Sequence, residues 1–289
     1  MPTRRLGRTD HHSSVVVLGG AAFWSGTPER VEESFQAALD AGVNHVDIAP
    51  SYGEAESLVG PLIAPVRDQL FIGEKSNRYA ADDVRRDLDR TLERFGTDHV
   101  DLYQAHGVTD VTDLERRADA FAAILRARDE GRTRFVGITG HDLGTPRAQL
   151  EALRRYDLDT VMFPCYPGVM ADPTYAADVA ALLDECARRD VGVHVIKAVA
   201  PQPWGDRERT RATWYEPWTT DERITEGVRF ALSTPGVHVM CSPGDRRLLP
   251  AVLAAAASFE PLGDDERTEI LGDAATWPTI FPLAEHAPR

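Results

Sequence analysis

Lysine is almost absent from this sequence of 289 residues. Of its 32 basic residues, 30 are arginine, and only Lys75 and Lys197 are lysine. A codon bias toward arginine explains the excess of arginine, but it does not explain why two positions kept lysine. Lysine can lose its proton when its pKa falls, whereas arginine effectively cannot. The two positions are therefore candidates for a chemical role.

Cysteine and long apolar runs are also scarce. Cys165, Cys186 and Cys241 are far apart and form no C-x-x-C pair, which argues against a disulfide framework or a zinc site and indicates a reducing compartment. The longest uncharged run of small residues, 251–259, is too short to span a bilayer. Residues 1–5 are not followed by the apolar core of a signal peptide. We therefore expect a cytoplasmic protein.

Positive charge is in deficit, with 32 basic and 46 acidic residues and a net charge of −14. Because nucleic acids and anionic membranes are bound by clustered cations, we expect neither as a partner. His11, His12 and His141 have no H-x-H partner at a strand end, so we expect no metal site. The content of 43% hydrophobic and 27% charged residues is typical of a globular protein. The sequence leaves the oligomeric state open.

Short β-branched runs alternate with longer amphipathic stretches along the whole chain. Eight runs have the two-sided apolar character of buried parallel strands, at residues 15–18, 43–48, 70–72, 100–103, 135–138, 160–163, 193–196 and 237–241. Their spacing predicts an α/β fold, a (β/α)8 TIM barrel. A doubly wound open sheet is the alternative, but it usually carries a G-x-G-x-x-G turn after its first strand, where this chain reads LGGAA.

The stretches between these runs predict helices with recognisable ends. Thr27 and Pro28 suit the start of a helix that stops at Gly42. The other helices are expected at residues 82–95, 114–128, from 145 onward, and at 175–189, 221–232, 248–257 and 264–271.

We expect residues 1–289 to form one domain. An N-terminal hairpin, with one arm at 4–6 and its turn at 7–10, would close the bottom of the barrel. A short C-terminal helix and a tail at 272–289 would end the chain. The longest irregular stretch, 200–220, follows the seventh strand and therefore belongs to the active face.

Reactive side chains fall at the ends of the predicted strands, where barrels build their sites. Asp47, Lys75 and His106 end the second, third and fourth strands, and Tyr52 follows in a turn closed by Gly53. An ammonium near a phenol stabilises the phenolate and lowers the pKa of the phenol, so Tyr52 could act as a general acid. Asp47 would hold Lys75, and His106 would position a carbonyl oxygen. Since none of these groups attacks carbon, we expect a hydride cofactor.

Three segments carrying these residues resemble the motifs of aldo-keto reductases. They are 47–53 (DIAPSYG), 73–76 (GEKS) and 98–106 (DHVDLYQAH), and segments 134–140 and 234–237 match the family in position. The resemblance implies a (β/α)8 barrel that binds a nicotinamide cofactor without a Rossmann domain. It also implies that Tyr52 is the general acid, that Lys75 and Asp47 tune it, and that His106 orients the substrate.

The resemblance further implies a cofactor site, which departs from the family pattern. Thr139 and His141 stand where Ser-Asn is usual, Met162 replaces a Gln, and Ile196, with Lys197 beside it, replaces a stacking residue. After the eighth strand, Arg246 or Arg247 could meet a 2′-phosphate, whereas Asp245 would favour a ribose hydroxyl. We expect NADPH, with NADH as the alternative. The cofactor-binding residues we expect are Ala22, Phe23, Asp47, Thr139, His141, Met162, Ile196, Lys197, Ser242, Gly244, Arg246 and Arg247.

The expected function is the NAD(P)H-dependent reduction of an aldehyde or ketone to an alcohol, or the reverse oxidation, with a small-molecule carbonyl substrate. Phe23, Trp24, Tyr79 and Trp204 are expected to line an aromatic substrate pocket. Two alternatives stay open. One is a Schiff-base lyase that uses Lys197, or Lys75, as its nucleophile. The other is a non-catalytic regulatory subunit that binds NADPH.

Overall fold

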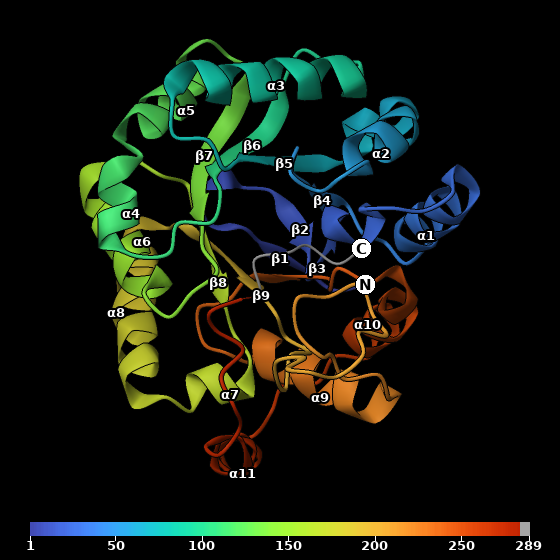
Figure 1. Ribbon diagram of the computed structural model, residues 1–289, viewed down its shortest axis with the longest axis vertical. Coiled ribbons are helices and arrows are strands. Elements are labelled where there is room, and N and C mark those ends of the chain that lie inside the picture. The colour runs from blue at the N-terminus through green and yellow to red at the C-terminus, as the bar shows by residue number, and fades with distance from the viewer. Residues whose placement is uncertain (284–289) are drawn as a thin grey trace.

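A closed barrel of parallel strands forms the centre of the computed structural model, which describes residues 1–283 (Figure 1). Its strands are β3 (Val16–Gly19), β4 (His45–Asp47), β5 (Phe71–Ser76), β6 (Val100–Ala105), β7 (Thr133–Thr139), β8 (Thr160–Pro164), β9 (Gly192–Ile196) and β10 (Val239–Cys241). Each strand pairs with the next in the chain, and β10 pairs with β3 to close the ring. The predicted (β/α)8 barrel is confirmed.

Helices surround the barrel as an outer layer, which Figure 1 shows as a ring around the strands. They are α1 (Pro28–Asp40), α2 (Ala55–Ile63), α3 (Ala81–Phe95), α4 (Val111–Arg116), α5 (Ala118–Asp129), α6 (Thr145–Arg155), α7 (Pro167–Met170), α8 (Pro173–Arg189), α9 (Asp221–Leu232), α10 (Leu249–Ala257) and α11 (Asp264–Ala274). In α3 the apolar spacing of Val84, Leu88 and Phe95 buries one face against the barrel.

Two helical features differ from the sequence expectation. The helix expected at 114–128 is split into α4 and α5 at Arg117, whose buried guanidinium bonds Asp113 one turn earlier. The short helices α2 and α7 have no counterpart among the predicted elements. Pro61 lies inside α2, and the helix is apolar around much of its surface, so its sequence carries little of the periodicity that marks a helix.

A hairpin closes the bottom of the barrel, at the amino ends of its strands. β1 (Thr3–Arg5) and β2 (His12–Ser14) pair antiparallel across a turn at residues 7–9. Gly7 has φ +50°, and a Cβ there would lie 2.4 Å from the Gly192 nitrogen, so the turn accepts only glycine. Leu6 is fully buried in the barrel interior with Phe71. The open mouth is therefore at the carboxyl ends of the strands.

The strand register places polar residues side by side inside this mouth. Period-two alternation sends every second side chain of a strand into the barrel. Asp47 pairs with Gly73 between β4 and β5, and Lys75 pairs with Gln104 between β5 and β6. Gly73 contributes no side chain, which leaves Lys75 room to reach Asp47 across it.

The irregular segment after β9 folds over one side of the mouth. Within residues 200–220, Trp204 Nε1 donates to the Thr213 carbonyl at 2.7 Å. The Ala212 amide donates to Asp245 Oδ2 at 2.8 Å, which anchors the segment to the loop after β10. This confirms that the segment lies on the active face.

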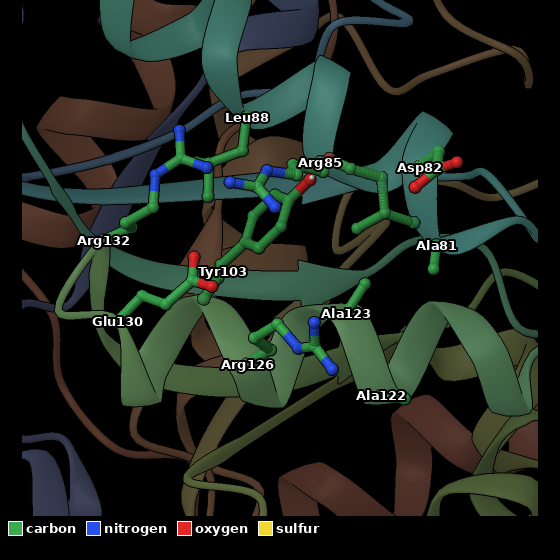
Figure 2. Close-up of a pocket in the computed structure, with 12 residues that line it drawn as sticks. Ala81, Asp82, Arg85, Leu88, Tyr103, Ala122, Ala123, Arg126, Glu130 and Arg132 are labelled. Carbon is green, nitrogen blue, oxygen red and sulfur yellow. Dashed lines mark hydrogen bonds between the residues drawn. The ribbon is translucent and has the colours of Figure 1, made fainter.

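A separate hollow of about 150 Å³ lies outside the barrel, between α3 and α5 (Figure 2). Tyr103 points outward from β6 into it and donates a hydrogen bond to the Val84 carbonyl at 2.8 Å. The hollow contains none of the predicted catalytic residues. Within residues 1–283, no helix combines the length and the hydropathy that a membrane crossing requires.

The C-terminal segment is described only in part. α11 forms where a C-terminal helix was expected, and the tail continues through Leu283. Residues 284–289 of the expected tail at 272–289 lie outside the described residues.

Candidate active site

A buried ion pair forms the floor of the mouth. Lys75 Nζ lies 2.5 Å from Asp47 Oδ2 and donates to the Ile48 carbonyl at 2.9 Å. The two side chains are only 1% and 5% exposed. Gln104 Nε2 donates to the other Asp47 oxygen at 3.1 Å. Burial is the largest single influence and lowers the pKa of Lys75, but the charge and hydrogen bond of Asp47, together with Tyr52 and Glu74, outweigh it, and the pKa lies above its ordinary value. Lys75 is therefore a permanent ammonium.

Tyr52 lies directly above this pair. Its amide donates to the Ala49 carbonyl at 3.0 Å, which closes a turn after β4. Gly53 continues the turn at φ +56°, against the Trp24 carbonyl, where a Cβ would lie only 2.6 Å away. Lys75 Nζ lies 5.1 Å from the centre of the Tyr52 ring. The turn thus holds the phenol over the ammonium.

The pKa of Tyr52 corrects one sequence expectation. Burial raises it to about 12, because the phenolate would lose its solvent, while Lys75 lowers it and Asp47 raises it. The ammonium acts in the expected direction, but desolvation is the larger effect. The free site therefore holds a protonated phenol.

Two histidines meet beside this phenol. His106, after β6, and His141, after β7, lie with their Nε2 atoms 3.1 Å apart, and the His106 ring stands perpendicular to the Tyr52 ring at 5.7 Å. Burial and then the nearby cations lower the pKa of both histidines well below the ordinary value. Two neutral imidazoles in this contact must be opposite tautomers, since one Nε2 has to donate and the other accept. Their buried Nδ1 atoms have no hydrogen-bond partner within the described residues.

Lys197 lies on the opposite side of the mouth, immediately after β9. Its side chain contributes to the walls of both cavities described below and lies 5.9 Å above the Tyr215 ring. Within residues 1–283 it forms neither an ion pair nor a side-chain hydrogen bond. Burial alone lowers its pKa to about 7.

The loop after β10 contains two arginines in different states. Arg247 grips Asp245 through Nε, at 2.9 Å from Oδ1, and Nη2, and it also bonds the Thr210 carbonyl. Arg246 is half-buried, and its guanidinium has no hydrogen bond or ion pair in the described part of the chain. Earlier in the loop, Ser242 Oγ accepts the Gly19 amide at 2.9 Å.

Two adjoining cavities share Tyr52, His141, Lys197 and Trp214. The outer cavity, of about 260 Å³, is completed by Trp24, Ser51, His106 and Leu283. The inner cavity, of about 70 Å³, runs toward the loop after β10 and is lined in addition by Gly19, Ala21, Asp47, Met162, Ile196, Tyr215, Cys241, Ser242, Pro243 and Gly244.

Several expected site residues lie outside these walls. Phe23 is fully buried in the core and Trp204 is inside its own loop, so neither faces substrate space. Tyr79 is 39% exposed and donates to Asp113, with its ring against Arg117. Thr139 Oγ1 accepts the Gly107 amide at 3.2 Å. Ala22, Arg246 and Arg247 also lie away from the walls.

Sequence reasoning missed other residues of the site, among them three that line the cavities and Gln104, which bonds Asp47. Trp214, and not Trp204 from the same Trp-rich segment, lines the cavities. Only tertiary packing distinguishes the two tryptophans. Gln104 precedes His106 by two residues and so points to the same face of β6, a signal that strand alternation offered. Nothing in the sequence marked Ser51 or Leu283.

Together these observations define a (β/α)8-barrel protein with a buried cluster of ionisable side chains at the carboxyl ends of its strands. The model of the Aldo/keto reductase family matches residues 15–200, more than half of the chain. The chain belongs to the aldo/keto reductase family, as its motifs predicted. Among residues 1–283, no group of three or more His, Cys, Asp or Glu side chains could hold a metal ion.

Two curated relatives and one solved structure are similar to the chain. L-galactose dehydrogenase from Arabidopsis thaliana is 27% identical over 181 residues, 57% of each chain. L-glyceraldehyde 3-phosphate reductase from Escherichia coli is 29% identical over 178 residues, 54% of this chain and 48% of that protein. The chain thus spans about half the length of the curated relatives it matches. The holo form of an aldo-keto reductase from Bacillus halodurans covers 94% of this chain and 96% of its own at TM-score 0.70 and 20% identity, a likeness of fold alone.

Proposed function

We propose that this protein is a nicotinamide-dependent oxidoreductase that reduces an aldehyde or ketone to an alcohol, or catalyses the reverse, with Tyr52 as the proton donor. The observation that carries the proposal is the buried Asp47–Lys75 pair directly beneath the Tyr52 ring. A buried ion pair at the mouth of a barrel costs desolvation energy. Its position beneath the Tyr52 phenol gives the ion pair a chemical role, which is to stabilise the phenolate.

Each residue of the site has its own role in the proton transfer. Tyr52 keeps its proton in the free site, and burial, which raises the pKa of the phenol to about 12, moves the phenolate further out of reach at neutral pH. A carbonyl oxygen that gains negative charge next to the phenol draws this proton, and Lys75 stabilises the phenolate that remains. Asp47 holds the Lys75 ammonium in position. His106, kept neutral, can donate a hydrogen bond to the same oxygen without competing as a cation.

The residues that line the inner cavity suit the nicotinamide end of a dinucleotide. Met162 and Ile196 contribute apolar wall, and His141, whose buried Nδ1 has no partner within residues 1–283, is a polar group beside them. Gly244 has no side chain where a Cβ would lie 3.2 Å from the Ala212 carbonyl, so the loop presents backbone to this space. When bound, the reduced nicotinamide would supply the hydride.

The preference for NADPH is supported by Arg246. Arg247 and Asp245 neutralise each other in a tight ion pair, so the repulsion of a 2′-phosphate that Asp245 would cause alone is removed. Arg246 keeps its guanidinium free of described partners and follows the loop that borders the inner cavity. A guanidinium in this state suits a phosphate.

The names of the two curated relatives support the same reaction class. One is a dehydrogenase named for L-galactose and the other a reductase named for L-glyceraldehyde 3-phosphate. Both names describe chemistry at a carbonyl or alcohol carbon, which the Tyr52 site suits.

A Tyr52→Phe variant tests the proposal. It should reduce the turnover of a generic aldehyde on the order of 10²–10⁴-fold, the contribution typical of a general acid. NADPH affinity, followed by quenching of protein fluorescence, should stay within a few-fold of wild type. Tyr79→Phe is the matched control, since it removes the same atom from a tyrosine outside both cavities. Equal turnover of Tyr52→Phe and wild type would refute the assignment.

A further inference from the structure

Lys197 has a backbone conformation that lysine rarely adopts. Its φ is +69°, in the left-handed region. The only other non-glycine residues with positive φ among residues 1–283 are Asp10 and Asp190, which end a turn and a helix and belong to a residue type that tolerates this region. A non-glycine residue keeps a strained φ of this kind only where the surrounding structure imposes it. Such residues concentrate at functional sites.

The Lys197 side chain faces a space that, within residues 1–283, holds no free opposite charge. The outer cavity is walled by Trp24, Trp214 and Leu283 on its apolar sides, and among the described residues Lys197 is its only Lys or Arg. None of the described residues in its wall is acidic. In the inner cavity the sole carboxylate from residues 1–283 is Asp47, which is already bonded to Lys75. The Lys197 ammonium is thus buried, without a described partner, and faces the space next to Tyr52.

We propose that Lys197 binds an anionic group of the carbonyl substrate, a carboxylate or a phosphate, so that the substrate class is an anionic aldehyde or ketone. This inference rests on the proposed function, since it places the anion in the same cavity as the proton donor. A buried cation without a partner is costly, and a bound anion would remove that cost.

The position of Lys197 favours the substrate over the cofactor as the source of the anion. The outer cavity is formed with His106 and the tryptophans and does not include the loop at 242–244. The cofactor is proposed to extend along that loop, past Gly244 toward Arg246. Lys197 borders both cavities, however, and a cofactor phosphate shares the chemistry of a substrate anion. The experiment must therefore distinguish the two.

Lys197 is also the group of this site that titrates near neutral pH. Around it, the pKa of His106 and His141 is lowered well below neutrality and the pKa of Tyr52, Tyr215, Cys241 and Lys75 is raised, while Asp47 is paired. Burial places the pKa of Lys197 at about 7. An anion should therefore bind best below pH 7 and progressively less well above it, as the ammonium loses its proton.

The test compares 4-carboxybenzaldehyde with the neutral 4-formylbenzamide as substrates, with NADPH, at pH 6 and pH 8. The measured quantity is the ratio of their kcat/KM values, in which any general loss of activity cancels. Wild type should prefer the anionic aldehyde at least tenfold at pH 6, and the preference should fall about tenfold at pH 8. Lys197→Met should abolish the preference at both pH values. Lys197→Arg should keep it at both, because arginine does not titrate there.

A matched control and a second readout keep the outcomes apart. Arg209→Met removes an exposed cation from the neighbouring loop and should leave the preference unchanged. Binding of benzoate and of benzamide to the NADPH-bound protein, measured by calorimetry, reports on the anion site without turnover. If neither aldehyde is reduced, the proposed function fails, whereas Lys197-dependent binding of benzoate would still support the anion site.

Three results would overturn the inference. The first is an equal preference in wild type and Lys197→Met, with equal benzoate binding. The second is a loss of NADPH affinity in Lys197→Met without a change in preference, which would assign Lys197 to the cofactor. The third is a covalent adduct between Lys197 and the aldehyde after borohydride treatment, which would make Lys197 a Schiff-base nucleophile.

Discussion

The two sides of the barrel mouth differ in whether their buried lysine has an ionic partner. On the β4–β6 side, Lys75 lies 2.5 Å from a carboxylate, and its pKa is raised above its ordinary value. On the β9–β10 side, Lys197 has no ionic partner among residues 1–283, and burial lowers its pKa to about 7. A paired buried cation fixes the geometry of its neighbours. An unpaired one is available to a ligand, and the fold gives up stability to keep it there.

The loop after β10 repeats this contrast on a smaller scale. Arg247 is bound to Asp245, so it holds the loop in shape and contributes little net charge. Arg246, its neighbour in sequence, has no described partner. Position along the chain therefore says less about the role of a cation in this protein than the presence or absence of a carboxylate beside it.

The largest effect is expected from Lys75→Met. Removing one member of a buried ion pair leaves Asp47 charged and without its partner, which should lower the free energy of unfolding by about 3–5 kcal/mol. Turnover should fall on the order of 10²–10⁴-fold, because Tyr52 loses the ammonium that stabilises its phenolate. Urea denaturation and aldehyde reduction measure the two losses.

The double variant Asp47→Asn/Lys75→Met is the control for this prediction. It leaves no unpaired charge, so it should recover part of the lost stability but none of the lost turnover. If the single variant is as stable as wild type, Lys75 is not a structural charge, and the contrast between the two lysines disappears.

The positions of both lysines at the barrel mouth were predictable from the sequence, because each lysine lies at the end of a strand. Apolar periodicity located every barrel strand, and residues at strand ends must converge once a sheet closes. Asp47, Tyr52, Lys75 and His106 followed from that rule. Both lysines were placed on the rim in the same way.

The residues that the sequence could not place belong to loops. Trp204 and Trp214 lie in one irregular segment, and only hydrogen bonds to distant residues decide which indole faces the cavity. The Tyr79 side chain is held away from the mouth by its hydrogen bonds with Asp113 and Arg117. The pKa of Tyr52 was also misjudged, because the extent of burial is a property of the folded state and competes with the charge of Lys75.

The pH dependence of stability should separate the two lysines next. Between pH 7 and pH 10 the unfolded chain keeps its proton on Lys197, whereas the folded chain releases it, since the pKa is about 7 when folded and about 10.4 when unfolded. The unfolded state then binds more protons, so stability rises with pH. The contribution of Lys197 should rise by up to about 1.4 kcal/mol per pH unit.

The measurement is the difference in unfolding free energy between wild type and Lys197→Met from pH 6 to pH 10. Lys75 adds no slope up to about pH 9, because it stays protonated in both states; the stability it contributes declines only above its unfolded pKa of about 10.4, as the pH rises toward its raised folded pKa. A flat difference curve would show that Lys197 is solvated or paired after all.

A smaller effect is expected from Arg246→Gln. Losing a charge-assisted contact to a 2′-phosphate should weaken NADPH binding about tenfold and leave NADH binding unchanged. Fluorescence quenching with both cofactors measures the change. Arg247→Gln is the comparison variant, and it should affect both cofactors alike, because it releases Asp245 and loosens the loop. If Arg246→Gln weakens the binding of NADPH and NADH equally, Arg246 does not bind the 2′-phosphate.

The smallest effect concerns the backbone of Lys197. Lys197→Ala and Lys197→Gly both remove the ammonium, but only glycine relieves the φ of +69°. The glycine variant should therefore be the more stable of the two by about 1 kcal/mol. At Ala198, whose φ is not positive and whose methyl group is buried, changing alanine to glycine should instead lower stability by at least about 0.5–1 kcal/mol, since the unfolded chain gains entropy and the methyl group loses its packing. The same chemical change with opposite sign at adjacent positions would show that the strain is local to Lys197. If glycine is destabilising at both positions, the backbone there is relaxed, and the orientation of the ammonium needs another cause.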